Sequence, residues 1–261
     1  MWGNEDALFA RRAGSFGMHA AAYADHRPDY PADGIRWALA GATRGPRRVV
    51  DLGAGTGKLA EGLLALGCEV LAVEPDPGML AELTRRLPGV STLDGTAERI
   101  PLDGSTVDAV LAGQAFHWFD QQAALTEIAR VLRPGGVLGA LWNHEDLRVD
   151  WVAELVALNR NSVSRTSSAG GEIAAHSAFH PVERETFPHS QLRTADSLTA
   201  TIGTHSHTLV VSESERAELL DRVRTYLRSR PETAAGEFEL PIRTTVLRAR
   251  LRTSVALEDQ A

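Results

Sequence analysis

The sequence predicts an α/β fold in which a doubly wound, mostly parallel sheet of seven strands carries helices on both faces. Short segments rich in Val, Leu and Ala alternate with segments of helical periodicity from residue 47 to residue 142. The first apolar segment runs directly into a glycine-rich loop at 53–57 and then into a helical segment. Such alternation is typical of parallel strands that helices bury on both faces.

The elements are expected in a simple order. Strands are predicted at 47–52, 69–74, 90–94, 107–112 and 136–142, and helices at 56–66, 77–86 and 120–132. After residue 142 the alternation ends, and the pattern predicts helices at 151–159 and 213–228 and late strands at 182–187 and 242–251. The segment 161–171 is rich in Ser, Ala, Asn and Gly, which is typical of a mobile lid.

The regions around this core are expected to form one domain with it over residues 1–261. Residues 7–42 read as helical pieces, in which Phe16, Tyr23 and Arg27 share one helix face until Pro28 and Pro31 end the pattern. The expected parts are a helical leader at 7–42, a core at 47–142, a substrate-recognition insert with a late strand at 145–208, and a C-terminal helix and strand at 209–261.

Composition excludes several classes of partner. The chain has 261 residues and a formal charge of −7, and its only dense basic stretch is 44–48, so neither a nucleic acid nor an anionic membrane is an expected partner. Cys68 is the single cysteine, which excludes an internal disulfide and a cysteine metal cluster. No apolar run approaches the roughly 20 residues of a membrane span, and no secretory signal is visible. We expect a cytoplasmic monomer or homodimer.

The glycine-rich loop 53–57 indicates a ligand at the end of the first strand, because glycines allow close backbone approach at a helix N-terminus. Its spacing narrows the ligand class. A phosphate-binding P-loop requires Gly and Ser or Thr at the places held by Leu52 and Leu59, and the dinucleotide fingerprint requires a glycine where Lys58 stands. The loop therefore favours a nucleoside-type ligand without a pyrophosphate.

Glu74 ends the second predicted strand and is placed to accept hydrogen bonds from both hydroxyls of a ribose. The alternative is a carboxylate that simply faces solvent. Met79 follows one helical turn later and either flanks an adenine ring or packs in the core. With the loop, Glu74 indicates an adenosine-type site.

Five motifs then occur in order: Val50-Asp51-Leu52-Gly53-Ala54-Gly55-Thr56-Gly57, Val73-Glu74-Pro75, Gly95-Thr96-Ala97-Glu98-Arg99-Ile100-Pro101-Leu102, Val107-Asp108-Ala109-Val110 and Arg130-Val131-Leu132-Arg133-Pro134-Gly135-Gly136. This series resembles the class I S-adenosylmethionine-dependent methyltransferases of the type 11 family, which have a Rossmann-like fold. The resemblance covers residues 49–142, and Tyr23 with residues 27–31 resembles a leader found in one branch of that family.

The resemblance implies S-adenosyl-L-methionine as cofactor, with Asp51, Gly53 and Gly55 around its methionine part, Glu74 on the ribose, and Ala97 with Glu98 at the edge of the adenine. Tyr23 and Arg27 either close over the amino-acid end of the cofactor or pack on the domain. The full set of expected cofactor-binding residues is Asp51, Gly53, Ala54, Gly55, Glu74, Pro75, Met79, Thr96, Ala97, Glu98, Gln114, Tyr23 and Arg27.

The methyl acceptor is expected beside the residues that follow the fourth and fifth strands, because ligands bind outside the carboxyl ends of such strands. His117 is the candidate general base, with a purely structural role as its alternative. Phe116, Trp118, Trp142 and His144 are the candidate acceptor contacts, although large aromatic side chains at such places also serve as packing.

Five further histidines, His176, His180, His189, His205 and His207, lack acidic or cysteine partners at metal-ligand spacing, so no metal is expected. The function expected is methyl transfer to a small-molecule acceptor, preferably at oxygen. The alternatives are methylation of a peptide or protein carboxylate and a non-catalytic cofactor-binding protein. The loop spacing disfavours a nicotinamide-dependent dehydrogenase.

Overall fold

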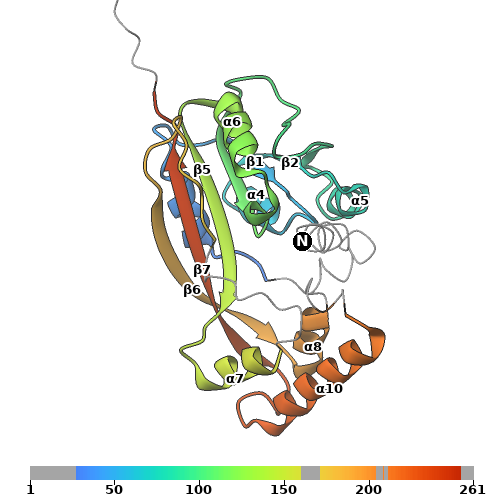
Figure 1. The fold of residues 1–261 in the computed structure, drawn as a ribbon. Helices are drawn as coiled ribbons and strands as arrows, with labels where there is room; N and C mark the ends of the chain where they lie inside the picture. The colour runs from blue at the N-terminus through green and yellow to red at the C-terminus, as the bar shows by residue number, and fades with distance from the viewer. Residues whose placement is uncertain (1–27, 160–170, 204–207, 209–210, 254–261) are drawn as a thin grey trace, which may run out of the picture.

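The computed structural model describes residues 28–159, 171–203, 208 and 211–253. These residues form a seven-stranded sheet with the strand order β3-β2-β1-β4-β5-β7-β6 (Figure 1). The strands are β1 (Arg48–Leu52), β2 (Glu69–Val73), β3 (Ser91–Leu93), β4 (Val107–Gly113), β5 (Leu132–Glu145), β6 (Glu183–Arg193) and β7 (Phe238–Arg250). Only β7 runs antiparallel to its neighbours. The predicted doubly wound fold is confirmed.

Helices cover both faces of the parallel part of the sheet. Successive residues of a strand point to opposite faces, so Val49 packs under one layer of helices and Val50 under the other. One layer consists of α3 (Ala32–Leu39), α4 (Lys58–Ala65) and α5 (Pro77–Arg86), and the opposite layer of α6 (Gln121–Val131). The parallel strands are apolar throughout because both of their faces are buried.

Two helices begin where an acidic side chain caps their first turn. The Asp76 carboxylate accepts hydrogen bonds from the backbone N–H groups of Gly78 and Met79 at the start of α5, and Asp120 does the same for α6. The expected helix 56–66 begins later, at Lys58, because Gly57 adopts a left-handed φ of 90° before it. These turns hold the strand ends and helix starts at one edge of the sheet.

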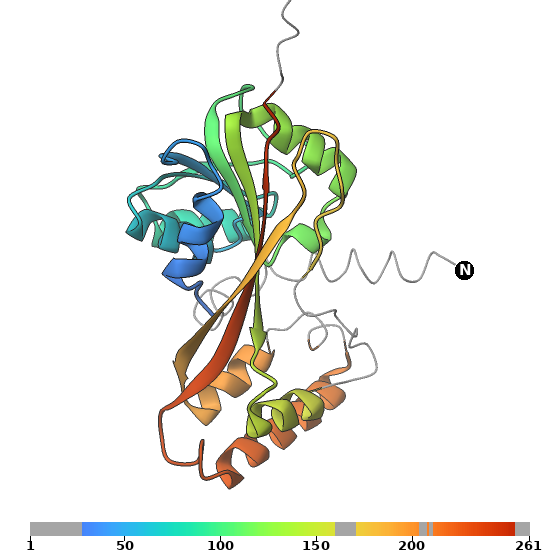
Figure 2. The same cartoon turned by 90° about the vertical axis from the view of Figure 1, so that its left-hand side faces the viewer.

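The last three strands extend well beyond the core and carry a second group of helices (Figures 1 and 2). This group contains α7 (Asp150–Leu158), α8 (Ala195–Gly203) and α10 (Glu213–Ser229). Trp151, Leu198, Val223 and Leu240 belong to its own apolar cluster, separate from the two clusters of the core. We call this part the distal module: α7, α8, α10 and the ends of β5, β6 and β7 that pack on them.

The distal module was only partly predicted. The expected strands 136–142, 182–187 and 242–251 are each longer in the structure, and α8 was not predicted. β6 continues past Pro188 because it is an edge strand, where a proline is tolerated. Most of the expected leader 7–42 and lid 161–171 lies outside the described residues. Within the described ranges no helix is long and apolar enough to cross a membrane.

Candidate active site

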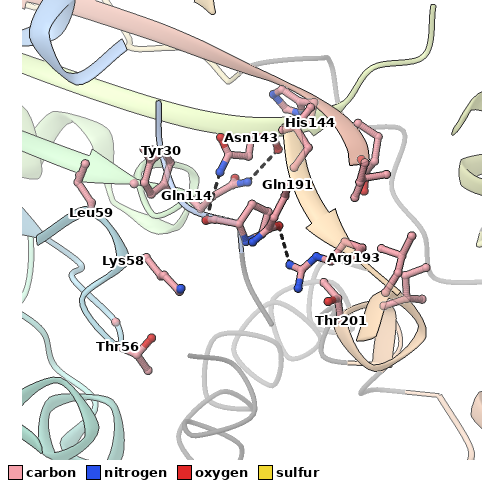
Figure 3. A pocket seen from close by; sticks show the side chains of 18 of the residues that line it. Tyr30, Thr56, Lys58, Leu59, Gln114, Asn143, His144, Gln191, Arg193 and Thr201 are labelled. Carbon is pink, nitrogen blue, oxygen red and sulfur yellow. Dashed lines mark hydrogen bonds between the residues drawn. The ribbon is translucent and has the colours of Figure 1, made fainter. Parts of the chain in front are cut away.

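Two cavities meet at the carboxyl ends of the parallel strands and share Gly53, Gly55, Gly113 and Gln114. The first, here called the Glu74 cavity, is also lined by Glu74, Pro75, Asp76, Met79, Gly95, Thr96, Ala97, Glu98, Ala115, His117, Trp118 and Phe119. The second, the Arg193 cavity, reaches from Asp51 and the glycine loop to β6, β7 and α8 of the distal module (Figure 3).

Glu74 ties the glycine loop to the end of β2. The backbone N–H of Gly55 donates to Glu74 Oε2 at 2.8 Å, and that of Asp76 donates to Oε1 at 2.9 Å. The residue is 8% exposed, and burial raises the pKa of its carboxyl while the two backbone hydrogen bonds lower it. A carboxylate fixed in this way presents its oxygens to hydroxyl donors in the cavity.

The glycine loop leaves room for a ligand directly above its backbone. Gly53 and Gly55 adopt φ angles of 67° and 55°, which side chains rarely adopt. A Cβ atom on Gly53 would lie 2.7 Å from the Cβ of Ala115, whereas one on Gly55 would meet no atom within 4 Å. Gly55 therefore faces open space at the junction of the two cavities.

Asp51 and Thr56 place buried polar atoms beside this space. Asp51 is 1% exposed, and neither of its oxygens forms a hydrogen bond with a described residue; the same holds for Thr56 Oγ1. Burial raises the pKa of Asp51 to about 7, opposed by the backbone amide of Ala60 and increased further by Glu74. Such groups fit a ligand that brings a cationic amino group and hydrogen-bond donors.

Gln114 separates the two cavities and is held in a strained backbone conformation, with a φ of 56°. Its Nε2 donates to the backbone oxygen of Asn143 at 2.9 Å. Asn143 Nδ2 donates to the backbone oxygen of Asp29 at 3.0 Å and its Oδ1 accepts from Thr244 Oγ1 at 2.6 Å. The network joins the end of β4, β5, β7 and the chain before α3. Figure 3 shows Gln114 and Asn143 side by side in the cavity wall.

Polar and apolar side chains of the distal module form the far wall of the Arg193 cavity. Gln191 and Arg193 extend from β6, and Arg193 Nη2 donates to Gln191 Oε1 at 2.6 Å. Neither residue was predicted, because the expected strand ended at residue 187. Their spacing of two, which places both on one face of a strand, is the signal that could have found them. Other lining residues outside the predicted set include Tyr30, Thr56, Lys58, Asn143 and Thr201.

The structure brings together every described residue of the expected cofactor set. Glu74, Pro75, Met79, Thr96, Ala97 and Glu98 line the Glu74 cavity, Asp51 and Ala54 line the Arg193 cavity, and Gly53, Gly55 and Gln114 line both. Tyr23 and Arg27 lie outside the described residues.

The residues expected to contact the methyl acceptor do not all line the same cavity. His117 and Trp118 line the Glu74 cavity, with ring centroids 4.8 Å apart, and His144 lines the Arg193 cavity. Phe116 and Trp142 line neither cavity. The short helix η2 (Phe116–Trp118) turns Phe116 into the core, where its ring packs edge-on against that of Trp142. These two aromatic residues are packing, so the expectation that they contact the acceptor is corrected.

Three of the five further histidines belong to the described residues. His176, His180 and His189 are described, whereas His205 and His207 are not. No group of three potential metal ligands occurs among the residues that the structure describes.

Comparisons with known proteins agree with this geometry. A methyltransferase domain family model matches residues 50–140. An uncharacterized methyltransferase of Mycobacterium tuberculosis is 41% identical over 239 residues, which cover 91% of this chain and 96% of the relative. The malonyl-[acyl-carrier protein] O-methyltransferase of Methylococcus capsulatus is 39% identical over 141 residues, which cover 50% of this chain and 51% of that protein.

Solved structures show the same fold. A protein of Anaeromyxobacter dehalogenans described as a type II methyltransferase matches with a TM-score of 0.61 and 26% identity, covering 86% of this chain and 97% of that one. A phosphoethanolamine N-methyltransferase of Haemonchus contortus in complex with S-adenosylhomocysteine matches with a TM-score of 0.53 and 18% identity, covering 94% of this chain and 59% of that one. The chain belongs to the class I S-adenosylmethionine-dependent methyltransferases.

Proposed function

We propose that this methyltransferase transfers the methyl group of S-adenosyl-L-methionine to an oxygen atom of a small-molecule acceptor. One observation carries the proposal: the Arg193 cavity opens from the same Gly113 and Gln114 that border the Glu74 cavity. An acceptor in the Arg193 cavity would therefore lie next to a cofactor held by the glycine loop. Side chains of the distal module line the far end of that cavity, and a lined cavity of this kind favours a small molecule over a macromolecular chain.

The residues of the Glu74 cavity fit the adenosine part of the cofactor. Glu74 would accept hydrogen bonds from the ribose hydroxyls, and the buried side chains of Met79 and Ala97 would flank the adenine ring. Asp51 would balance the charge of the methionine amino group. When bound, the cofactor supplies a methyl group on a positively charged sulfur, and the protein mainly aligns the acceptor with it.

Oxygen is the proposed acceptor atom for two reasons. The Methylococcus capsulatus relative is an O-methyltransferase, although it shares only half of its length with this chain. His144 also lines the Arg193 cavity, and burial followed by the charge of Arg184 lowers the pKa of its imidazole. A neutral imidazole beside the acceptor can take a proton from a hydroxyl, whereas a carboxylate acceptor needs no base.

The test incubates the protein with isotope-labelled cofactor and a host extract that is separated by molecular size. We expect label in the small-molecule fraction, in a product whose methyl group is released by mild alkali if an ester has formed. The Glu74→Ala variant provides the background. Label confined to macromolecules would favour methylation of a peptide or protein carboxylate, and binding without transfer would favour a non-catalytic protein.

A further inference from the structure

The distal module opens part of its own apolar core to the Arg193 cavity. Four side chains belong both to the apolar cluster of this module and to the lining of the cavity: Leu198 and Ile202 of α8, and Leu240 and Ile242 of β7. All four are buried, so the face that they turn to the cavity is the uncovered side of a packed core. We call these four side chains the apolar end of the cavity.

Two different elements contribute to the apolar end. Leu198 and Ile202 are four residues apart and therefore lie one turn from each other on the same side of α8. Leu240 and Ile242 are two residues apart, so their side chains lie on the same side of β7. A helix and a strand of the sheet thus present hydrocarbon to the same part of the cavity.

The polar side chains at this end form hydrogen bonds within the protein. Arg193 Nη2 donates to Gln191 Oε1 at 2.6 Å, and Thr201 Oγ1 donates to the backbone oxygen of Ser197, one turn earlier on α8, at 2.9 Å. Figure 3 shows Gln191, Arg193 and Thr201 together on this side of the cavity. These bonds meet part of the demand of buried polar groups for partners, whereas the apolar side chains beside them gain only from contact with another apolar surface.

We propose that the methyl acceptor carries an uncharged hydrocarbon group that occupies the apolar end, while its reactive oxygen lies on the Gln114 side of the same cavity. This inference rests on the proposed function, because the oxygen must face a cofactor held in the Glu74 cavity. The four side chains of the apolar end then select the acceptor. An acceptor with a polar group at both ends would bury one of them against hydrocarbon, which is costly.

The test measures binding of primary alcohols to protein saturated with S-adenosylhomocysteine. The probes run from butan-1-ol to octan-1-ol, and hexan-1-ol is compared with hexane-1,6-diol. In the wild type, the affinity measured by calorimetry should rise about fourfold for each added methylene until the apolar end is filled, because each buried methylene contributes a similar transfer free energy. Hexan-1-ol should bind roughly tenfold more tightly than the diol, whose second hydroxyl meets the apolar end.

The Ile202→Ala variant tests where the hydrocarbon binds, and Leu227→Ala is its matched control. Both substitutions remove most of a buried aliphatic side chain from the same apolar cluster, but Leu227 does not line the cavity. Ile202→Ala should weaken binding of hexan-1-ol roughly threefold to tenfold, because the ligand loses contacts with the removed atoms. Leu227→Ala should bind hexan-1-ol as the wild type does.

Binding of S-adenosylhomocysteine by each variant shows that it is folded. If Ile202→Ala does not fold, Ile242→Val takes its place, with an expected loss of about twofold to fourfold. Equal affinity along the alcohol series, or for hexan-1-ol and its diol, would overturn the inference. An unchanged affinity in Ile202→Ala, or an equal loss in Leu227→Ala, would also overturn it. Cofactor label confined to macromolecules, with the alcohol series still graded, would contradict the proposed function instead.

Discussion

Replacing Asp51 by Asn should stabilise the ligand-free protein while weakening its hold on the cofactor. Asp51 is buried without a hydrogen bond to a described residue, and its pKa is raised from 3.8 to about 7. The native state therefore binds more protons than the unfolded state between these values, and stability falls as the pH rises through this window. This pKa difference corresponds to a loss of about 4 kcal/mol in the free energy of unfolding once the pH exceeds 7.

The assay is urea unfolding of the ligand-free wild type and Asp51→Asn across this pH range. The free energy of unfolding of the variant should exceed that of the wild type by up to about 4 kcal/mol above pH 7, and the gap should narrow toward pH 4. Affinity for S-adenosylhomocysteine should fall, because the amide cannot balance an amino group. An Asp51→Asn protein that is less stable than the wild type throughout would refute this reasoning.

The Asp146→Asn variant is the control, because the pKa of Asp146 is shifted in the opposite direction to that of Asp51. The hydrogen bonds of Arg148 lower the pKa of Asp146 to about 2, so its carboxylate stabilises the fold above pH 3.8 and loses this effect as the pH falls toward 2. The variant should be less stable than the wild type by the same amount at every pH between 5 and 8. A pH-dependent difference in this range would point to another titrating group.

Three further substitutions separate the roles of the site. Glu74→Ala should weaken binding of S-adenosylhomocysteine by about 1–3 kcal/mol in calorimetry. Glu69→Ala, at the exposed start of β2, should leave this affinity unchanged. Equal losses in the two variants would show that Glu74 does not bind the ribose. His117→Ala should weaken cofactor affinity and leave kcat at saturation unchanged, because His117 lines the Glu74 cavity; a lower kcat with intact affinity would establish it as the base. Phe116→Ala should lower the free energy of unfolding by about 3–5 kcal/mol, against less than about 0.5 kcal/mol for exposed Leu192→Ala.

The residues that line the Glu74 cavity could be predicted because their places follow from chain order. Parallel strands buried on both faces are uniformly apolar, and their ends are marked by Gly53 and Glu74, so the sequence locates the residues that gather at one edge. What could not be predicted was the direction of side chains in the turn after β4. Phe116 and His117 are adjacent in the chain, yet one is fully buried and the other is exposed at a cavity.

The Arg193 cavity, the proposed acceptor side, was hidden for a different reason. β6 lies at the edge of the sheet, and its mostly exposed side chains give no apolar alternation by which a strand is recognised. Arg193 therefore looks like an ordinary surface residue in the sequence. β6 pairs with β7 as far as Arg193, which lies opposite Phe238. This pairing extends the strand far enough to place Arg193 at the cavity.

The long strands that join the core to the distal module also determine how acceptor choice can change. Along β6 and β7, inward Gln191, Arg193, Leu240 and Ile242 alternate with outward Leu192 and Glu239. Substituting these inward residues would change the shape of the Arg193 cavity at the distal module and leave the glycine loop unchanged. Inserting a single residue would instead rotate the whole following segment and turn its cavity side chains to solvent. Evolution of this enzyme toward new acceptors is thus expected to proceed by substitution in these strands, with their length conserved.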